Sequence, residues 1–217
     1  MSTQNFSLHV TPEIGDVSAV IIIPEKPICI ITLAHGAGAG MNHAFMVGLA
    51  NGLAEENIGT LRFNFPFIEN KKGRPDLPAV AHKTIESAFQ HAKKNNPSLP
   101  IFLSGKSFGG RMSSQYLAQH NDSAIKGIIF YGFPLHPPKK PSTDRAEHLK
   151  QVKQPMLFLQ GTRDELAEWH LIEGVCASLA NATLLKLEGV DHSLKKGKEN
   201  LVRELARQTR EWINTIL

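Results

Sequence analysis

A segment in the middle of the chain changes within a single residue from the pattern of a buried strand to that of a helix. Residues 101–104 are apolar or small, and the residues after 110 place Met112, Tyr116 and Leu117 at helical spacing. The junction reads Gly-Lys-Ser-Phe-Gly, a G-x-S-x-G pattern with Ser107 at its centre. Glycines on both sides of the serine permit a tight turn, because a side chain there would collide with the neighbouring strand or helix. The sequence therefore predicts a strand–turn–helix unit that holds Ser107 above the sheet edge, at the start of a helix.

The rest of the chain alternates between strand and helix patterns. Strands are predicted at residues 5–10, 17–23, 28–34, 58–64, 101–104, 125–131, 155–160 and 182–187. Helices are predicted at residues 44–55, near 81–92, after Ser107, near 169–179 and near 201–216, and about 143–151 can be helical. The first two strands form an antiparallel edge pair, whereas strands that alternate with helices need crossover connections. We therefore expect one α/β domain over residues 1–217, with a doubly wound, mostly parallel sheet and an antiparallel N-terminal edge.

An acid and a histidine follow Ser107 in positions where they could reach it. Asp164 ends a Gly-Thr-Arg-Asp turn after the strand at 155–160, and His192 follows the last strand. Active sites of such sheets lie beyond the carboxyl ends of the strands, and the order Ser, Asp, His is the one expected of an α/β-hydrolase. A serine hydroxyl is a poor nucleophile unless an imidazole takes its proton and a carboxylate holds that imidazole. We predict that Asp164 serves His192, since the side chain of the adjacent Asp191 points to the opposite side.

Further residues at the same sheet edge are candidates for binding substrate. The turn from His35 to Gly38 is rich in glycine, so the Ala37 N–H can act with the Phe108 N–H as an oxyanion hole. The predicted substrate-binding residues are His35, Gly36, Asn64 and His136. His35, His43 and His136 all fall on this side, where we expect structural or substrate-facing roles rather than that of the general base.

Several simpler interpretations remain beside the catalytic one. Ser107 and Asp164 could be helix caps, and His192 could be a surface or satisfied core histidine. The GKS sequence lacks the first glycine of a P-loop because Pro100 stands there, and the last glycine of a dinucleotide-binding fingerprint would fall on Met41. No zinc-ligand spacing is present, so we expect no metal and no cofactor.

Composition excludes several classes of partner. The net charge of +4 comes from scattered lysines rather than a continuous basic stripe, so no nucleic-acid partner is expected. No apolar run is long enough to span a membrane, and the first residues lack the pattern of a signal peptide, so a cytoplasmic protein without membrane partners is expected. The two cysteines, Cys29 and Cys176, are predicted to be buried free thiols.

Four segments carry a resemblance to a known family: AHGAGAGMNHAFM, LRFNFPF, GKSFGGRM and FPLHPP. With the order of strands, they resemble a small member of the α/β-hydrolase superfamily, in the group that includes a testis-expressed member and a subunit of the NSL acetyltransferase complex. The layout is also similar to that of dienelactone hydrolases, although these have cysteine where this chain has Ser107. The resemblance implies that Ser107, Asp164 and His192 are nucleophile, acid and base, and that Ala37 and Phe108 are the oxyanion donors.

These patterns lead to two hypotheses of function. The first is a serine hydrolase that cleaves a small ester or thioester through an acyl-enzyme on Ser107, and that acts as a monomer or homodimer. The second is an interaction or scaffold protein of the same fold whose triad is idle. The connection at 132–154, where lids are usually inserted, is short and rich in proline, so we predict an open site without a lid domain.

Overall fold

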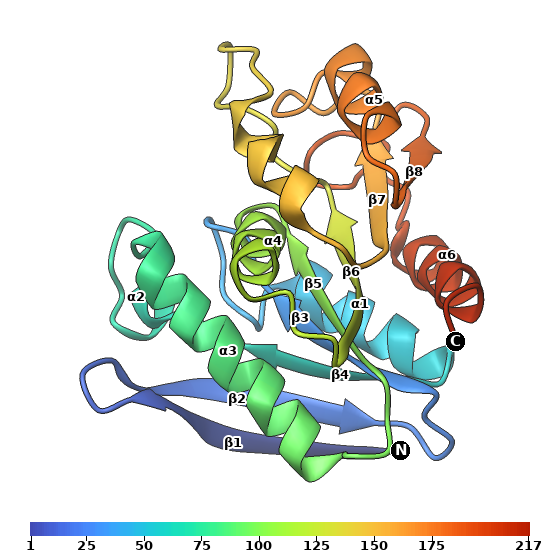
Figure 1. Cartoon of the computed structure of the whole chain (residues 1–217). Helices are drawn as coiled ribbons and strands as arrows, with labels where there is room; N and C mark the ends of the chain where they lie inside the picture. The colour runs from blue at the N-terminus through green and yellow to red at the C-terminus, as the bar shows by residue number, and fades with distance from the viewer.

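The computed structural model describes residues 1–217 and is built on one twisted eight-stranded sheet (Figure 1). The strand order is β1-β2-β4-β3-β5-β6-β7-β8. β1 pairs antiparallel with β2, and β2 pairs antiparallel with β4, whereas all other neighbours are parallel. The strands are β1 (Ser2–Thr11), β2 (Gly15–Ile23), β3 (Cys29–Ala34), β4 (Ile58–Phe63), β5 (Ile101–Lys106), β6 (Ile125–Tyr131), β7 (Met156–Gly161) and β8 (Ala182–Leu187). The predicted fold class, with its antiparallel edge, is therefore confirmed.

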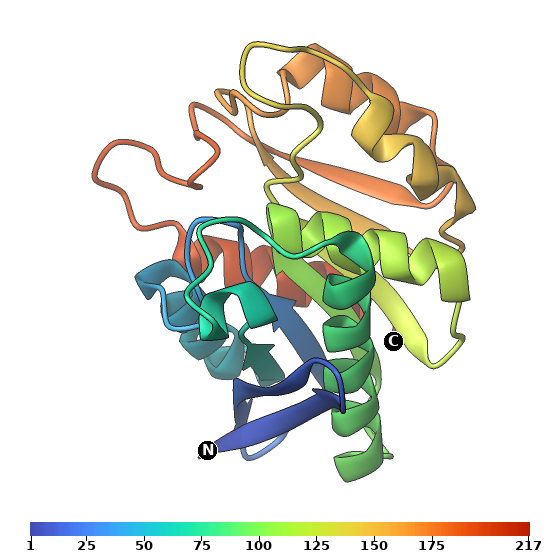
Figure 2. The same cartoon turned by 90° about the vertical axis from the view of Figure 1, so that its left-hand side faces the viewer.

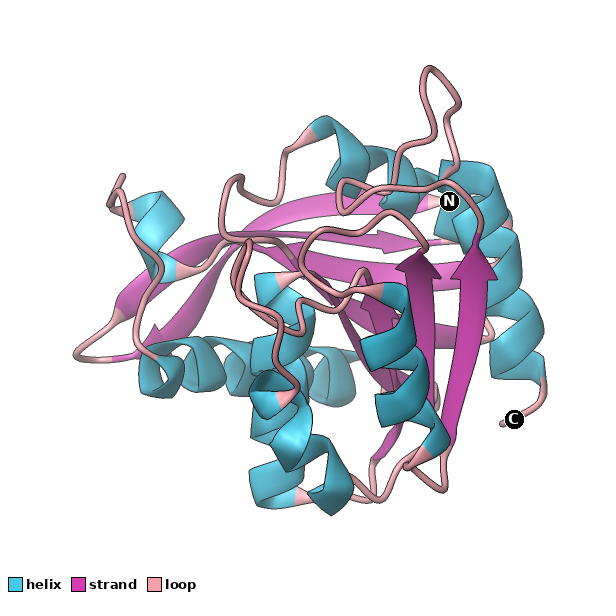
Figure 3. Cartoon of the chain, turned by 90° about the horizontal axis from the view of Figure 1, so that it is seen from above, coloured by secondary structure: helices cyan, strands magenta, loops and turns pink.

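Helices cover both faces of this sheet, as Figure 3 shows from above. They are α1 (Ala44–Glu55), α2 (Pro66–Glu69), α3 (Pro78–Asn95), α4 (Phe108–His120), the 3-10 helix η1 (Asp144–Gln151), α5 (Trp169–Ala177) and α6 (Val202–Asn214). One hydrophobic cluster joins the sheet to α3, α4, η1 and α5, and a second joins its other face to α1 and α6. Burial on both faces explains why β3, β4 and β7 contain no exposed residue.

Two connections near the carboxyl ends of the strands differ in how well they were predicted. The segment after β4 contains the short helix α2, with Pro66 in its first turn, and the sequence analysis did not predict this helix. Asp76 Oδ2 accepts a hydrogen bond from the Phe67 N–H at 2.7 Å, so the residues beyond α2 fold back on its start. The segment 132–154 forms only η1, which packs against α4, and no lid domain is present.

The structure contains no helix with both the length and the hydrophobicity needed to cross a bilayer. Cys29 and Cys176 are buried free thiols, as expected, and burial raises the pKa of each to about 12. Both therefore remain protonated thiols at neutral pH, and neither is a reactive thiolate.

Candidate active site

Ser107 lies at a strained turn between the last residue of β5 and the first residue of α4. Its backbone has φ +50° and ψ −114°, a region that residues with side chains rarely adopt. A Cβ on Gly105 would collide with the backbone of Gly109 and Gly110, and one on Gly109 would collide with the Ala34 carbonyl. The glycines of the G-x-S-x-G pattern are thus required by the close packing of β5, α4 and β3. Such strain costs about 1–3 kcal/mol and is typical of functional turns.

A continuous chain of hydrogen bonds joins Ser107, His192 and Asp164. His192 Nε2 lies 2.8 Å from Ser107 Oγ, and His192 Nδ1 lies 2.8 Å from Asp164 Oδ2 and 3.0 Å from Oδ1. With a carboxylate at Nδ1, the neutral imidazole carries its proton there and leaves the Nε2 lone pair free for the serine hydroxyl. The fold therefore brings together the three residues that the sequence singled out, from the ends of β5, β7 and β8.

Hydrogen bonds from neighbouring groups hold the Asp164 carboxylate in its orientation toward His192. Its side chain is fully buried, yet Gln160 Nε2 donates to Oδ2 at 2.7 Å and the Leu166 N–H donates to Oδ1 at 2.8 Å. Gln160 Oε1 in turn accepts from the Phe133 N–H. Sequence reasoning missed Gln160, although a glutamine in the otherwise apolar strand β7 was a visible signal. The neighbouring Asp191 instead accepts a hydrogen bond from the Lys195 N–H within its own loop.

The two candidate oxyanion donors are the main-chain N–H groups of Ala37 and Phe108. The Ala37 N–H makes no hydrogen bond within the protein, and Ala37 lines the cavity in front of Ser107. Phe108 is the first residue of α4, so its N–H has no intrahelical acceptor. The Phe108 ring packs edge-on against Phe65 and Phe67, which fixes the start of the helix. Neither N–H group therefore has an acceptor within the protein, and that of Phe108 lies at the positive end of the α4 dipole.

His35 does not face the substrate, contrary to the prediction. Its side chain is completely buried, its Nδ1–H donates to the Gly36 carbonyl, and its Nε2 accepts from the Phe65 N–H at 2.9 Å. Burial lowers the pKa of His35 to about 4, so the ring is neutral at physiological pH. Both ring nitrogens are used in holding the turn that carries Gly36 and Ala37. Its role is to position that turn.

The predicted substrate-binding role of Asn64 and His136 is also contradicted by the directions of their side chains. Asn64 Oδ1 accepts from the Met41 N–H at 2.8 Å and its Nδ2 donates to Glu69, so it braces the far end of the same turn. His136 is 1% exposed, and its Nδ1–H donates to the Pro137 carbonyl. Neither side chain lines the cavity. The sequence placed these residues at the correct edge of the sheet but could not show which way their side chains point.

A cavity of about 460 Å³ opens in front of Ser107. Gly36 is the one predicted substrate-binding residue that lines it. His43, which was expected on this side of the sheet, also lines it. The wall further includes side chains that sequence reasoning did not assign to the site: Phe45, Met46, Lys106, Leu166, Ser193 and Lys195. No acidic side chain lines this cavity, and two lysines do. Its wall is thus partly apolar and partly cationic.

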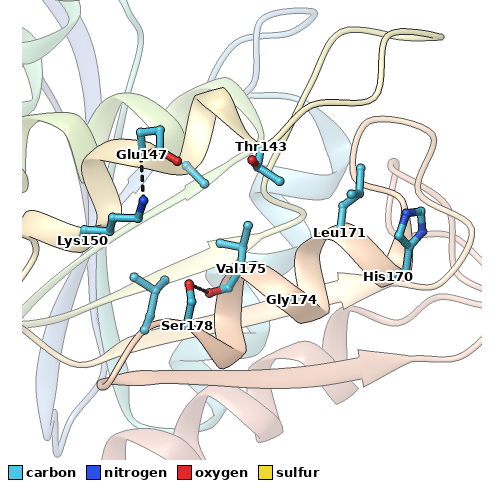
Figure 4. Close-up of a pocket in the computed structure, with 10 residues that line it drawn as sticks. Thr143, Glu147, Lys150, His170, Leu171, Gly174, Val175 and Ser178 are labelled. Carbon is cyan, nitrogen blue, oxygen red and sulfur yellow. Dashed lines mark hydrogen bonds and ion pairs between the residues drawn. The ribbon is translucent and has the colours of Figure 1, made fainter.

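Another pocket, between η1 and α5, lacks such an arrangement (Figure 4). Ser178 Oγ donates to the Val175 carbonyl in its own helix, and Lys150 pairs with Glu147 along η1. His170 is exposed at the other end. No serine there contacts a histidine, so this pocket offers no activated nucleophile. No group of three or more His, Cys, Asp or Glu side chains is arranged to hold a metal ion.

Comparison with known proteins supports the same fold. Three solved structures share the fold: an alpha-beta serine hydrolase homologue from Coxiella burnetii, a dienelactone hydrolase from Anabaena variabilis, and a serine hydrolase without a lid from Xanthomonas campestris. The first is 20% identical with a TM-score of 0.78, and the alignment covers 97% of this chain and 97% of that one. The second is 16% identical with a TM-score of 0.77, and the alignment covers 100% of both chains. The third is 18% identical with a TM-score of 0.76, and the alignment covers 100% of this chain and 96% of that one. A family model described as an alpha/beta hydrolase domain matches residues 27–215. The chain therefore belongs to the alpha/beta hydrolase family.

Proposed function

We propose that this protein is a serine hydrolase that cleaves a small ester or thioester through an acyl-enzyme on Ser107. The observation that carries the proposal is the position of His192, whose two ring nitrogens contact Ser107 Oγ and Asp164 at the same time. A helix cap or a satisfied core histidine would require neither the strained φ of Ser107 nor a buried carboxylate behind the imidazole.

The geometry supports a reaction in two steps. Ser107 Oγ attacks the carbonyl carbon while its proton passes to His192 Nε2, and the carbonyl oxygen gains the negative charge. The Ala37 and Phe108 N–H groups stabilise that oxyanion. Collapse of the intermediate expels the alcohol or thiol, which takes the proton from His192, and leaves the acyl group on Ser107. Water then attacks the acyl-enzyme with the same base, and Asp164 stabilises the imidazolium in both steps.

The lining of the cavity suits small substrates that are neutral or negatively charged. Its apolar wall contains Phe45, Met46 and Leu166, which suits a short acyl chain or a ring. With two lysines and no carboxylate lining the cavity, a cationic substrate would meet like charges at its wall, while an anionic one would be attracted. A small organic ester is the partner that we propose, and no metal or cofactor has a part in the mechanism.

The second hypothesis is an interaction protein with an idle triad. It draws on the resemblance to the group that includes a testis-expressed member and a subunit of the NSL acetyltransferase complex. The assembled Ser107–His192–Asp164 chain favours the enzyme, because an idle site has no need to keep a strained serine and a buried carboxylate in register.

Labelling with a fluorophosphonate separates the two hypotheses. An active serine attacks the phosphorus and becomes covalently modified, so we expect added mass on the peptide that contains Ser107 and none in Ser107→Ala. Folded wild-type protein that stays unlabelled would support the interaction protein and contradict the enzyme. A panel of p-nitrophenyl esters and acyl thioesters that differ in chain length and charge would then define the acyl group.

A further inference from the structure

Lys106, the residue before the serine, makes a contact that the proposed reaction has not used. It is the last residue of β5, and its Nζ donates a hydrogen bond of 2.6 Å to the main-chain carbonyl of His192. The side chain is half-buried and lines the cavity with Ser107. A lysine at this position therefore ties the strand that carries the nucleophile directly to the backbone of the base.

His192 needs such a tie because it lies on an irregular segment. Residues 188–201 connect β8 to α6. Figure 2 shows this connection as an orange-red loop that projects from the body of the molecule. Its start is held from the other side, where Thr162 Oγ1 accepts from the Gly189 N–H and the Val190 carbonyl accepts from the Arg163 N–H. From residue 191 to residue 199 the hydrogen bonds between main-chain groups are internal to the segment, such as the one from the Asp191 N–H to the Lys195 carbonyl. The Lys106 bond anchors the main chain of His192 itself.

We propose that Lys106 is a positioning residue that holds the His192 backbone so that Nε2 stays within hydrogen-bond distance of Ser107 Oγ. The inference rests on the proposed function for its kinetic effect, although the bond itself does not. Lys106 does not touch the reacting atoms and acts through His192. A shift of about 1 Å in the position of a catalytic group can lower the rate on the order of 100-fold, so a single anchor of this kind is kinetically important.

The charge of Lys106 makes this anchor sensitive to pH. Burial lowers the pKa of Lys106 to about 8, against the opposing attraction of the Asp164 and Asp191 carboxylates. His43, His192 and Lys195 are the other titratable side chains that line the cavity. As the pH rises through about 8, the ammonium becomes an amine, and a charge-assisted hydrogen bond becomes a weaker neutral one. Turnover should then fall on the alkaline side because His192 is held less firmly.

The test compares Lys106→Met and Lys106→Arg with a control, Lys196→Met. Lys196 is an exposed lysine on the same connection, and its side chain makes no hydrogen bond to His192. Turnover of a short p-nitrophenyl ester should show kcat about 10-fold or more lower in Lys106→Met, with KM little changed. Lys106→Arg should recover much of the loss, and its activity should not decline near pH 8, because arginine stays charged throughout. Lys196→Met should match the wild type.

Amide hydrogen exchange at pH 7 supplies a readout that does not depend on turnover. We expect faster exchange over residues 189–194 in Lys106→Met than in Lys196→Met, with the thermal unfolding midpoints of both close to the wild type. Unchanged kcat, an unchanged alkaline decline and equal exchange in the two variants would overturn the proposal. If the wild type neither turns over esters nor labels with fluorophosphonate, the proposed function fails, while the exchange comparison still decides whether Lys106 anchors the base.

Discussion

At the scale of single residues, the site distinguishes between two candidates for the acid that orients His192. Asp164 is buried and bonded to His192 Nδ1, whereas Asp191 is exposed and accepts from the Lys195 N–H. Asp164→Asn should leave the histidine in the wrong tautomer and lower turnover by a factor on the order of 10³ to 10⁴. Asp191→Asn should lose about tenfold or less, as for a solvated charge. Steady-state kinetics of the two variants decides between them, and the reverse ranking would contradict the assignment.

Ser107 and His192 should behave as one catalytic unit. Because each proton transfer by the histidine serves the formation or breakdown of the acyl group on Ser107, removing either residue removes the same reaction. We expect Ser107→Ala, His192→Ala and the double variant to lose turnover to about the same extent, as in catalytic units generally. Circular dichroism should show that all three remain folded. Losses that add up across the double variant would mean that the two residues act independently.

The residues of the triad could be predicted because each follows a strand that the hydrophobic pattern locates. Ser107 and Asp164 belong to short glycine-containing turns, and the chain order completes the inference. Side-chain direction could not be predicted. His35 and His136 lie at the right edge of the sheet, yet their rings turn into the protein and bond to backbone groups. Lys106 could not be found either, because its partner is a main-chain carbonyl far away in the sequence.

At the scale of elements, β4 contains a buried arginine with unsatisfied hydrogen-bond donors. Arg62 is 7% exposed and lies in register with Val20 and Leu33, on the face covered by α1. Its Nε and Nη1 have no hydrogen-bond partner, and burial lowers its pKa. Since each unsatisfied buried donor costs about 1–3 kcal/mol, Arg62→Met should raise the free energy of unfolding by roughly that amount.

Urea denaturation of Arg62→Met beside Arg203→Met tests this prediction. Arg203 is an exposed arginine on α6, so its replacement should change stability by about 0.5 kcal/mol or less. A variant at position 62 that is clearly less stable than the wild type would show that the guanidinium contributes favourable contacts.

The strands and long helices were predicted closely, because buried apolar runs and helical periodicity are local signals. The predicted helix at residues 44–55 coincides with α1, and the strand at 125–131 coincides with β6. The short helix α2 was missed because it has only four residues and lies in a stretch rich in proline and charge. It forms through contacts with distant groups, such as the Glu69 carboxylate with the Ser18 N–H, which no local pattern reveals.

At the scale of the whole molecule, the charges around the cavity should select among substrates. Lys106 and Lys195 line it and no carboxylate does. We expect kcat/KM for a cationic ester, such as one with a trimethylammonium leaving group, to be lower than for a neutral ester of similar size. An ester with a carboxylate on its acyl chain should be the better substrate at low salt, with the difference shrinking as the ionic strength rises. Preference for the cationic ester would contradict this prediction.

The absence of a lid should determine how long a substrate the protein accepts. The connection at 132–154 contributes only η1, packed against α4, so no mobile domain covers the cavity or offers an apolar surface to an oil–water interface. The cavity of about 460 Å³ holds a small acyl group, whereas a long chain would leave most of its apolar surface in water. Across p-nitrophenyl esters of increasing chain length, kcat/KM should therefore peak at short chains and fall for long ones. Emulsified long-chain esters should give no jump in rate at the concentration where an interface forms. Faster turnover of long-chain lipid esters at an interface than of short soluble esters would show that another part of the molecule binds the chain.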